Sequence, residues 1–105
     1  MTRGEVFRIA SPRGARGHEQ RGARYGVIVQ ADELLELSTV LIAPTSTSAL
    51  RTSFRPAITV DGTTTWVVVD QTAVHDVRRL GRSVGLLESH ELRAVDEALA
   101  LVLGL

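Results

Sequence analysis

The sequence predicts a mainly β protein of the α+β class, in which a small antiparallel barrel or strongly bent sheet carries one C-terminal helix. Two observations lead to this prediction. Short runs of β-branched and aliphatic residues recur between turn signals along most of the chain, whereas only the last segment has the spacing of an amphipathic helix. With 105 residues the chain is long enough for one hydrophobic core, so we expect a single domain over residues 1–105.

The first half of the chain contains three segments with the composition of strands: residues 3–9, 24–30 and 39–43. The second and third are continuously apolar at their centres, which is typical of buried strands, and Pro44 is expected to end the third. Residues 10–23, rich in Gly and charge, predict a long loop of a kind that is usually functional or disordered. Residues 31–38 predict a helical turn.

The second half contains three further segments that we expect to be strands: residues 54–60, 66–69 and 81–87. Asp61-Gly62 predicts a hairpin turn between the first two, and residues 70–80 predict a short helix or turn. Ser89 is a suitable N-cap for the final helix, which Gly104 ends. One face of this helix is apolar and is expected to pack on the core: Leu92, Val95, Leu99, Val102 and Leu103.

The composition excludes several kinds of site. The sequence has no cysteine, which rules out disulfides, thiolate zinc sites and a cysteine nucleophile. His18, His75 and His90 lack the local spacing of a zinc site, so we expect no metal and no cofactor. No apolar run approaches the roughly 18 residues of a membrane span, and the N-terminus has no signal-peptide pattern. We therefore expect a cytoplasmic protein that does not contact a membrane.

The charge distribution favours an anionic partner. All twelve basic residues are Arg, and half of them lie in residues 1–24, where only two Glu oppose them. Arginine binds phosphate through two parallel hydrogen bonds and stacks on bases, so this basic strip is suited to RNA. A GC-rich genome, which favours Arg codons, also explains the absence of Lys. The clustering of the arginines is therefore the more informative observation.

One arginine and a group of hydroxyl residues could act together on a phosphate. Arg24 opens one predicted buried strand, and Thr45, Ser46 and Thr47 follow the next. In a bent sheet the start of one strand and the end of the next can lie close together at one end of the sheet. A guanidinium beside a hydroxyl would stabilise the charge that develops on a phosphate during substitution. In RNA the 2′-OH of the substrate can be the nucleophile, so the reaction needs no metal. Spacing alone does not choose among the three hydroxyl residues.

Five blocks of the sequence, in chain order, resemble the MazF/PemK family of toxins. They are RGEVF at 3–7, HEQRGARYGVIVQAD at 18–32, STVLIAPTS at 38–46, VVDQ at 68–71 with RLGRSVG at 79–85, and VDEAL at 95–99 with LGL at 103–105. Together they extend from residue 3 to residue 105 with the spacing of the family.

This resemblance implies an SH3-like barrel of the MazF/CcdB type with a C-terminal helix, and a homodimer. It implies a sequence-specific, metal-independent endoribonuclease toxin that cleaves single-stranded RNA (mRNA, tRNA or rRNA). Attack by the 2′-OH would leave 2′,3′-cyclic phosphate and 5′-OH ends. It also implies a cognate antitoxin protein that covers the RNA groove and inhibits the enzyme.

The resemblance also assigns residues to roles. The catalytic Arg of the family falls on Arg24, and its catalytic Thr falls on Ser46, which keeps the hydroxyl. Tyr25 replaces the Pro that follows the catalytic Arg, and Ala73 replaces an Arg that often follows the family's Gln. Residues expected to contact RNA are His18, Glu19, Gln20, Tyr25, Thr45, Thr47 and Gln71. His18 has the right ordinary pKa, near 6.5, for acid–base chemistry, but an exposed loop histidine is the alternative interpretation.

Two non-catalytic functions are alternatives to the ribonuclease. A CcdB-like gyrase inhibitor has the same architecture and does not cut RNA, which is an analogy of fold alone. An RNA-binding module that has lost turnover is the other. The presence of both Arg24 and Ser46 favours the enzyme, whereas a gyrase inhibitor would have no use for Arg24. His75 and His90 are expected to be structural or exposed.

Overall fold

The computed structural model describes residues 1–10 and 24–105. Its strands are β1 (Glu5–Ile9), β2 (Tyr25–Ile28), β3 (Thr39–Ser46), β4 (Ala57–Val60), β5 (Thr63–Val67), β6 (Ala73–Asp76) and β7 (Leu80–Leu86). Its helical elements are the 3-10 turns η2 (Asp32–Leu34), η3 (Val69–Gln71) and η4 (Val77–Arg79), and the helix α1 (Ser89–Leu103). The predicted loop over residues 10–23 lies, apart from Ala10, outside the described residues.

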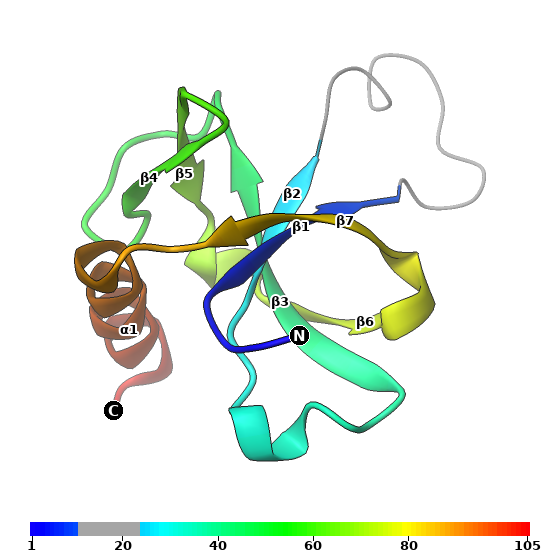
Figure 1. Cartoon of the computed structure of the whole chain (residues 1–105). Helices are drawn as coiled ribbons and strands as arrows, with labels where there is room; N and C mark the ends of the chain where they lie inside the picture. Colours follow the sequence, from blue (N-terminus) through cyan, green and yellow to red (C-terminus); the bar gives the residue numbers. More distant parts are fainter. Residues whose placement is uncertain (11–23) are drawn as a thin grey trace.

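The strands form one curled antiparallel sheet with the helix at one side (Figure 1). Its order is β4-β5-β3-β2-β1-β7, and β6 pairs with β3 beside this path. Figure 1 shows α1 near the β4–β5 hairpin, while β6 and η4 lie at the opposite end. The predicted class, a bent antiparallel sheet with a C-terminal helix, is confirmed.

The two central strands β2 and β3 are buried on both faces. Val27 and Ala43 face the main core, into which α1 inserts Val95 and Ala98. Ile28 and Ile42 face a second core on the opposite side of the sheet, together with Val40. Because successive strand residues point to opposite faces, an unbroken apolar run is needed to fill both cores. This explains the continuous apolar runs of these two segments.

Strand β3 does not end at Pro44, contrary to the prediction. On one edge it pairs with β2 through Pro44, and on the other it pairs first with β6, up to Ile42, and then with β5, from Thr45. On the edge that β3 shares with β6 and β5, Pro44 lies between the two partners and pairs with neither. The missing backbone N–H of proline is therefore tolerated on this edge. The backbone carbonyl of Pro44 still accepts from Val68 N–H at 2.8 Å. The strand therefore extends to Ser46, a candidate catalytic residue.

Three predictions for the second half of the chain need correction. The strand expected over 54–60 begins only at Ala57, and that expected over 66–69 covers Thr63–Val67 and is followed by η3. Residues 70–80, expected to be a short helix or turn, contain the strand β6 between two 3-10 turns. The strand β6 forms because it completes the edge of β3, a long-range partner that local composition does not reveal.

Helix α1 is capped by Glu88 and not by Ser89. The Glu88 side chain accepts from the backbone of Glu91, and Glu91 Oε1 accepts from Glu88 N–H at 2.9 Å, which makes a capping box. Gly104 ends the helix as predicted, with φ 73°. Of the apolar face, Val102 and Leu103 are exposed and not in the core. No helix of the described residues is long and apolar enough to cross a membrane.

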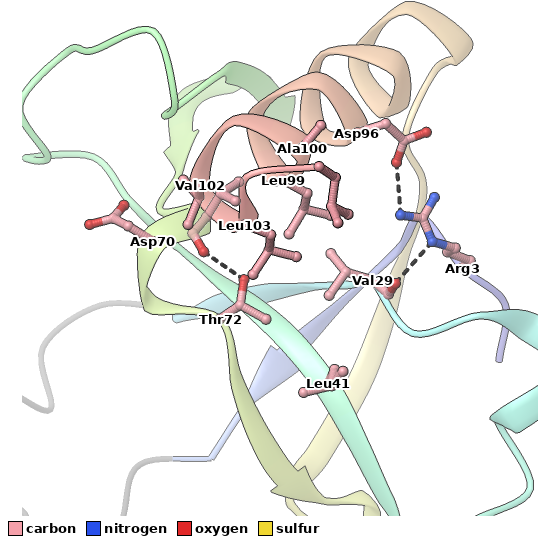
Figure 2. Close-up of a pocket in the computed structure, with 12 residues that line it drawn as sticks. Arg3, Val29, Leu41, Asp70, Thr72, Asp96, Leu99, Ala100, Val102 and Leu103 are labelled. Atoms are coloured by element: carbon pink, nitrogen blue, oxygen red, sulfur yellow. Dashed lines mark hydrogen bonds and ion pairs between the residues drawn. The ribbon is translucent and has the colours of Figure 1, made fainter.

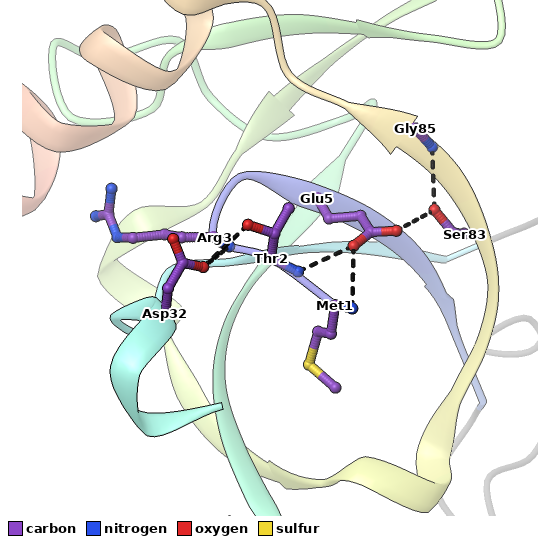
Figure 3. A network of polar contacts seen from close by, with 7 residues as sticks. All are labelled: Met1, Thr2, Arg3, Glu5, Asp32, Ser83 and Gly85. Carbon is purple, nitrogen blue, oxygen red and sulfur yellow. Dashed lines mark hydrogen bonds and ion pairs between the residues drawn. The ribbon is translucent and has the colours of Figure 1, made fainter. Parts of the chain in front are cut away.

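The N-terminal segment is anchored by two carboxylates (Figure 3). Glu5 accepts from Thr2 N–H at 3.0 Å and from Ser83 Oγ on β7 at 2.6 Å. Asp32 accepts from Thr2 Oγ1 at 3.0 Å and from Arg3 N–H at 2.7 Å. These hydrogen bonds lower the pKa of Asp32, that from Arg3 most strongly. The start of β1 is thus held between β7 and η2.

Gly26, in the middle of β2, allows the closest approach in the sheet. A Cβ at this position would overlap the Cγ2 methyl group of Ile42 and the Cδ1 methyl group of Ile9. Gly26 is buried and pairs with Phe7 on one side and Pro44 on the other. The absence of a side chain therefore lets both isoleucines pack directly on the backbone of β2.

Candidate functional site

Arg24 and Ser46 are brought together by the pairing of β2 with β3. The register pairs Gly26 with Pro44, and continuing it by two residues places Arg24 across from Ser46. One cavity of about 200 Å³ is lined by both side chains and by Pro44, Thr45, Ala49, Arg55, Val68 and Gln71. The meeting of strand ends that the sequence predicts is therefore found, with a guanidinium and a hydroxyl on one cavity.

The three neighbouring hydroxyl residues have different surroundings. Thr45 is buried, and its Oγ1 donates to the backbone carbonyl of Tyr25 at 3.3 Å, which ties β3 to β2. Ser46 Oγ accepts from Ser48 N–H at 3.2 Å and lies 3.3 Å from Ser48 Oγ. Thr47 is exposed. Ser46 is therefore the one of the three that is both held by the following turn and placed on the wall of this cavity without being buried.

Arg55 is a second cation of the cavity, which the sequence analysis missed. Its Nε and Nη2 donate to the two carboxylate oxygens of Asp70 at 3.0 and 2.8 Å. The hydrogen bond from Arg55 lowers the pKa of Asp70, and the same hydrogen bond raises the pKa of Arg55. Both groups therefore remain charged over the whole physiological range. The guanidinium also lies over the Phe54 ring, with its carbon 5.5 Å from the ring centroid.

The proximity of Arg55 and Asp70 can be inferred from the sequence. The hairpin turn at Asp61-Gly62 was predicted, and β4 pairs with β5 so that Ala57 lies opposite Trp66. Residues shortly before Ala57 and shortly after β5 must then leave the hairpin at the same end. Counting outward from the turn would have placed Arg55 near Asp70.

A smaller hollow adjoins the cavity and shares Thr45 and Ser46 with it. It has a volume of about 80 Å³ and is lined by Tyr25, Thr45, Ser46, Thr47, Val60, Thr63 and Thr65. Tyr25 is half-buried and packs against the main core, so the core fixes the position of its ring. Gln71, at the end of η3, is exposed and lines the larger cavity. The two hollows thus bring most of the described candidate residues to one end of the sheet.

The two described histidines, His75 and His90, do not line these two hollows. His18, Glu19 and Gln20 are outside the described residues, so their role in RNA binding stays a prediction. His90 is exposed on α1, whereas His75 is half-buried on β6. In the part of the chain that the structure describes, no three His, Asp or Glu side chains gather to hold a metal ion.

The sequence profile of PemK-like, MazF-like toxins of type II toxin–antitoxin systems matches residues 2–103. The chain belongs to this toxin family. A protein of Mycobacterium tuberculosis (strain ATCC 25618 / H37Rv), described as a candidate toxin, is 39% identical over 106 residues, which cover 100% of this chain and 99% of the relative. The resemblance of the five sequence blocks to the MazF/PemK family is therefore confirmed.

Solved structures of MazF toxins have the same fold. An endoribonuclease from a mycobacterial species, in complex with its cognate antitoxin, superposes with a TM-score of 0.82 at 21% identity, over 100% of this chain and 96% of that chain. The Mycobacterium tuberculosis toxin MazF-mt6 gives 0.77 at 20% identity, over 96% and 97%. MazF from Deinococcus radiodurans gives 0.76 at 20% identity, over 100% and 97%. The MazF-type architecture is therefore shared along the whole chain.

Proposed function

We propose that this toxin is a sequence-specific, metal-independent endoribonuclease that cuts single-stranded RNA. The observation that carries the proposal is the single cavity on which Arg24 and Ser46 meet, with Arg55 beside them. Two guanidinium groups and a hydroxyl are donors suited to phosphate oxygens. Membership of the toxin family and the likeness to structures that are named endoribonucleases support the same proposal.

The reaction would be an internal transfer on the RNA. The 2′-oxygen attacks the adjacent phosphorus, loses its proton, and the bond from phosphorus to the 5′-oxygen breaks. The leaving 5′-oxygen takes up a proton, so the products end in a 2′,3′-cyclic phosphate and a 5′-OH. Arg24 and the Ser46 hydroxyl would donate hydrogen bonds to the non-bridging oxygens, whose negative charge increases in the transition state. Because the substrate supplies the nucleophile, no metal-bound water is required.

The other described residues would hold the substrate. Arg55, fixed by Asp70, offers a second cation to the RNA backbone, and Gln71 offers an amide to the same cavity. Tyr25 and Thr47, on the smaller hollow, are suited to a base that stacks on a ring and bonds to hydroxyls. Sequence preference would arise here, because base edges and not phosphates distinguish one RNA from another.

We also propose that two copies of the chain form a homodimer through an apolar groove (Figure 2). The groove has a volume of about 590 Å³, and its walls are the last two turns of α1 and the adjacent face of the sheet. Leu41 of β3 and Val102 and Leu103 of α1 are exposed here, and Val74 of β6 is exposed across from Leu41. Figure 2 shows the groove closed at one end by the ion pair of Arg3 with Asp96, 2.7 Å apart.

A continuous apolar patch on a small protein is typical of an interface. A second copy fits this groove because it brings the same apolar residues, so that a twofold axis makes the patch complementary to itself. We infer that a cognate antitoxin inhibits the enzyme, and one similar structure is named as an endoribonuclease in complex with its cognate antitoxin.

The test of the ribonuclease is cleavage of a long single-stranded RNA in EDTA by the purified protein. We expect discrete fragments with cyclic phosphate and 5′-OH ends, and a loss of about 10²- to 10³-fold in rate for Arg24→Ala. Arg93→Ala, which removes an exposed arginine of α1, is the matched control and should cleave like the parent. Cleavage by Arg24→Ala at the parent rate would refute the site. Absence of cleavage by all three proteins would favour a non-catalytic toxin.

A further inference from the structure

A third hollow, separate from the two described above, is lined by Arg24 and not by Ser46. Its volume is about 160 Å³. The residues that line it include three with nitrogen-bearing side chains, Arg24, His75 and Arg79, together with Ile9, Tyr25 and Pro44. None of the described residues that line it is acidic. Apolar walls with a few cationic and hydrogen-bonding groups suit one nucleotide, whose base is flat and apolar on its faces and whose phosphate is anionic.

This hollow is a neighbour of the candidate catalytic cavity. Arg24 and Pro44 line both, so the two spaces meet at a shared wall. An RNA strand with one phosphate at Arg24 would therefore have a neighbouring nucleotide beside this hollow. The groups that would meet that nucleotide come from β6 and η4.

His75 has an unusual environment on β6. It pairs with Val40 of β3, so its side chain is on the same face of the sheet as the second core, and it is half-buried there. Its Nδ1 atom is buried and has no hydrogen-bond partner among the described residues. Burial lowers the pKa of His75, and the nearby Arg79 lowers it further, so the imidazole is neutral at physiological pH. A neutral imidazole has one donor and one acceptor nitrogen, as a base edge requires of its partner.

Arg79 is held at the rim of the same hollow. Its Nη2 donates to the backbone carbonyl of Ala10 at 2.8 Å, which fixes the guanidinium where β1 ends. A buried polar atom without a partner costs free energy, and such atoms are rare in folded proteins unless a ligand or a function explains them. His75, whose Nδ1 atom is unpaired, lines the same hollow as Arg79 and the candidate catalytic residue Arg24.

We propose that this hollow is a second RNA subsite, in which His75 hydrogen-bonds the base and Arg79 faces the phosphate of the nucleotide next to the scissile bond. The inference rests on the proposed ribonuclease function and deepens it by naming a specificity-determining residue. His75 was expected to be structural or exposed. We instead assign it a hydrogen bond to an RNA base.

The test is the affinity of the protein for an RNA oligonucleotide that spans a mapped cut site and carries 2′-deoxyribose at the attacked position. His75→Val should weaken binding roughly 3- to 10-fold, the loss of one neutral hydrogen bond. The same change should raise Tm, because valine favours strands and removes the unpaired buried atom. His75→Asn, which keeps a polar atom near the Nδ1 position, should retain most of the affinity. His90→Ala, at an exposed position, should change neither quantity.

Truncated oligonucleotides locate the effect. The loss caused by His75→Val should vanish when the RNA lacks nucleotides on one side of the cut and persist when it lacks those on the other. Parent-like binding by His75→Val, or a loss that persists with both truncations, would overturn the subsite while RNA cleavage by the parent still stood. If the parent neither cleaves nor binds RNA, both the subsite and the proposed function are wrong.

Discussion

At the scale of single residues, Ser46 stands where the resemblance to the family implies a threonine. Its hydroxyl lies on the cavity of Arg24 and is held by the turn at Ser48. A threonine at this position would add a methyl group that restricts χ1, whereas serine relies on its hydrogen bond from Ser48 to fix the rotamer. The proposed catalytic role of the hydroxyl can therefore be separated from its orientation by substitution.

Ser46→Ala should lower kcat roughly 10- to 100-fold, since it removes one hydrogen bond to a charged phosphate. Ser46→Thr keeps the hydroxyl and adds a methyl group, and it should retain most of the activity. Single-turnover cleavage of one RNA measures both. Ser48→Ala is the control, because it removes a neighbouring hydroxyl and keeps the backbone N–H that bonds Ser46. A parent-like kcat for Ser46→Ala would move the role to another residue.

Arg55 should act on substrate binding and less on the chemical step. Asp70 fixes its guanidinium through two hydrogen bonds, and the lowered pKa of Asp70 keeps that carboxylate ionised well below neutral pH. Arg55→Ala should raise KM roughly tenfold, as expected for a lost charge-assisted contact, with a smaller change in kcat. Arg51→Ala, an exposed arginine close by in the chain, should leave KM unchanged. Equal losses in kcat and kcat/KM would instead make Arg55 a transition-state residue.

Sequence reasoning identified the site only in part, and the reason is physical. Arg24 and Ser46 follow from the family spacing, and the pairing of β2 with β3 accounts for their proximity. Arg55 was missed because its function depends on Asp70, which only the β4–β5 hairpin brings within reach. His75 was missed because burial of one ring nitrogen is a property of the packed sheet and not of its neighbours in the chain.

At the scale of elements, the sequence predicts those that are apolar along their whole length and fails at short, partnered ones. The strands β2 and β3 and the helix α1 have strong periodic or apolar signals. The strand β6 has four residues, of which two are polar, and it forms only against β3. The end of β3 was misjudged because Pro44 lies where the strand changes partners. Such features depend on tertiary pairing, which local composition does not encode.

The junction of α1 with the sheet depends on Glu91. This buried carboxylate accepts from Glu88 N–H and from Thr59 N–H of β4, both at 2.9 Å. Glu91→Ala would leave two backbone donors without a partner and should destabilise the fold by about 1–3 kcal/mol. Glu91→Gln, which keeps one acceptor oxygen, should lose less. Urea unfolding of the two variants and the parent measures this, and an unchanged midpoint for Glu91→Ala would contradict the role.

Asp76 should make the β6–η4 corner sensitive to acid. Its carboxylate accepts from the backbone and side chain of Arg78, and the side-chain hydrogen bond is the largest cause of a pKa lowered from 3.8 to about 2. A carboxylate with a depressed folded-state pKa stabilises the fold above its unfolded pKa, and this contribution is lost as pH falls through the folded value. Asp76→Asn should therefore lower Tm at neutral pH, with a difference from the parent that shrinks between about pH 4 and 2. A pH-independent difference would contradict this sign.

At the scale of the whole molecule, the apolar face of α1 extends from the core into an open groove, and the sequence pattern is the same in both parts. Val95 and Ala98 enter the core, but Val102 and Leu103 continue the same apolar stripe into an open groove. Periodicity shows that a face is apolar and does not show whether it meets its own chain or another one. The predicted core contact of the last turn was therefore wrong, and the proposed dimer gives those side chains a partner.

Leu103→Glu should shift the protein from dimer to monomer in multi-angle light scattering, because a charge in the groove would be buried without a partner. Leu101→Glu is the matched control, since Leu101 is exposed on the same helix and does not line the groove. Both variants should retain the circular dichroism of the parent. A parent that is monomeric at all accessible concentrations, or a dimeric Leu103→Glu, would refute this interface.

The relative position of Arg24 and Ser46 also depends on Gly26. Strands β2 and β3 are apolar on both faces, so hydrophobicity alone would tolerate a slip of one residue between them. Only glycine fits where Ile9 and Ile42 press on the backbone, so a shifted strand would put a bulkier residue into that gap. The space at Gly26 therefore fixes the register of β2 against β3. Arg24 and Ser46 line one cavity, and we infer that this alignment depends on the missing side chain at Gly26, two positions after Arg24.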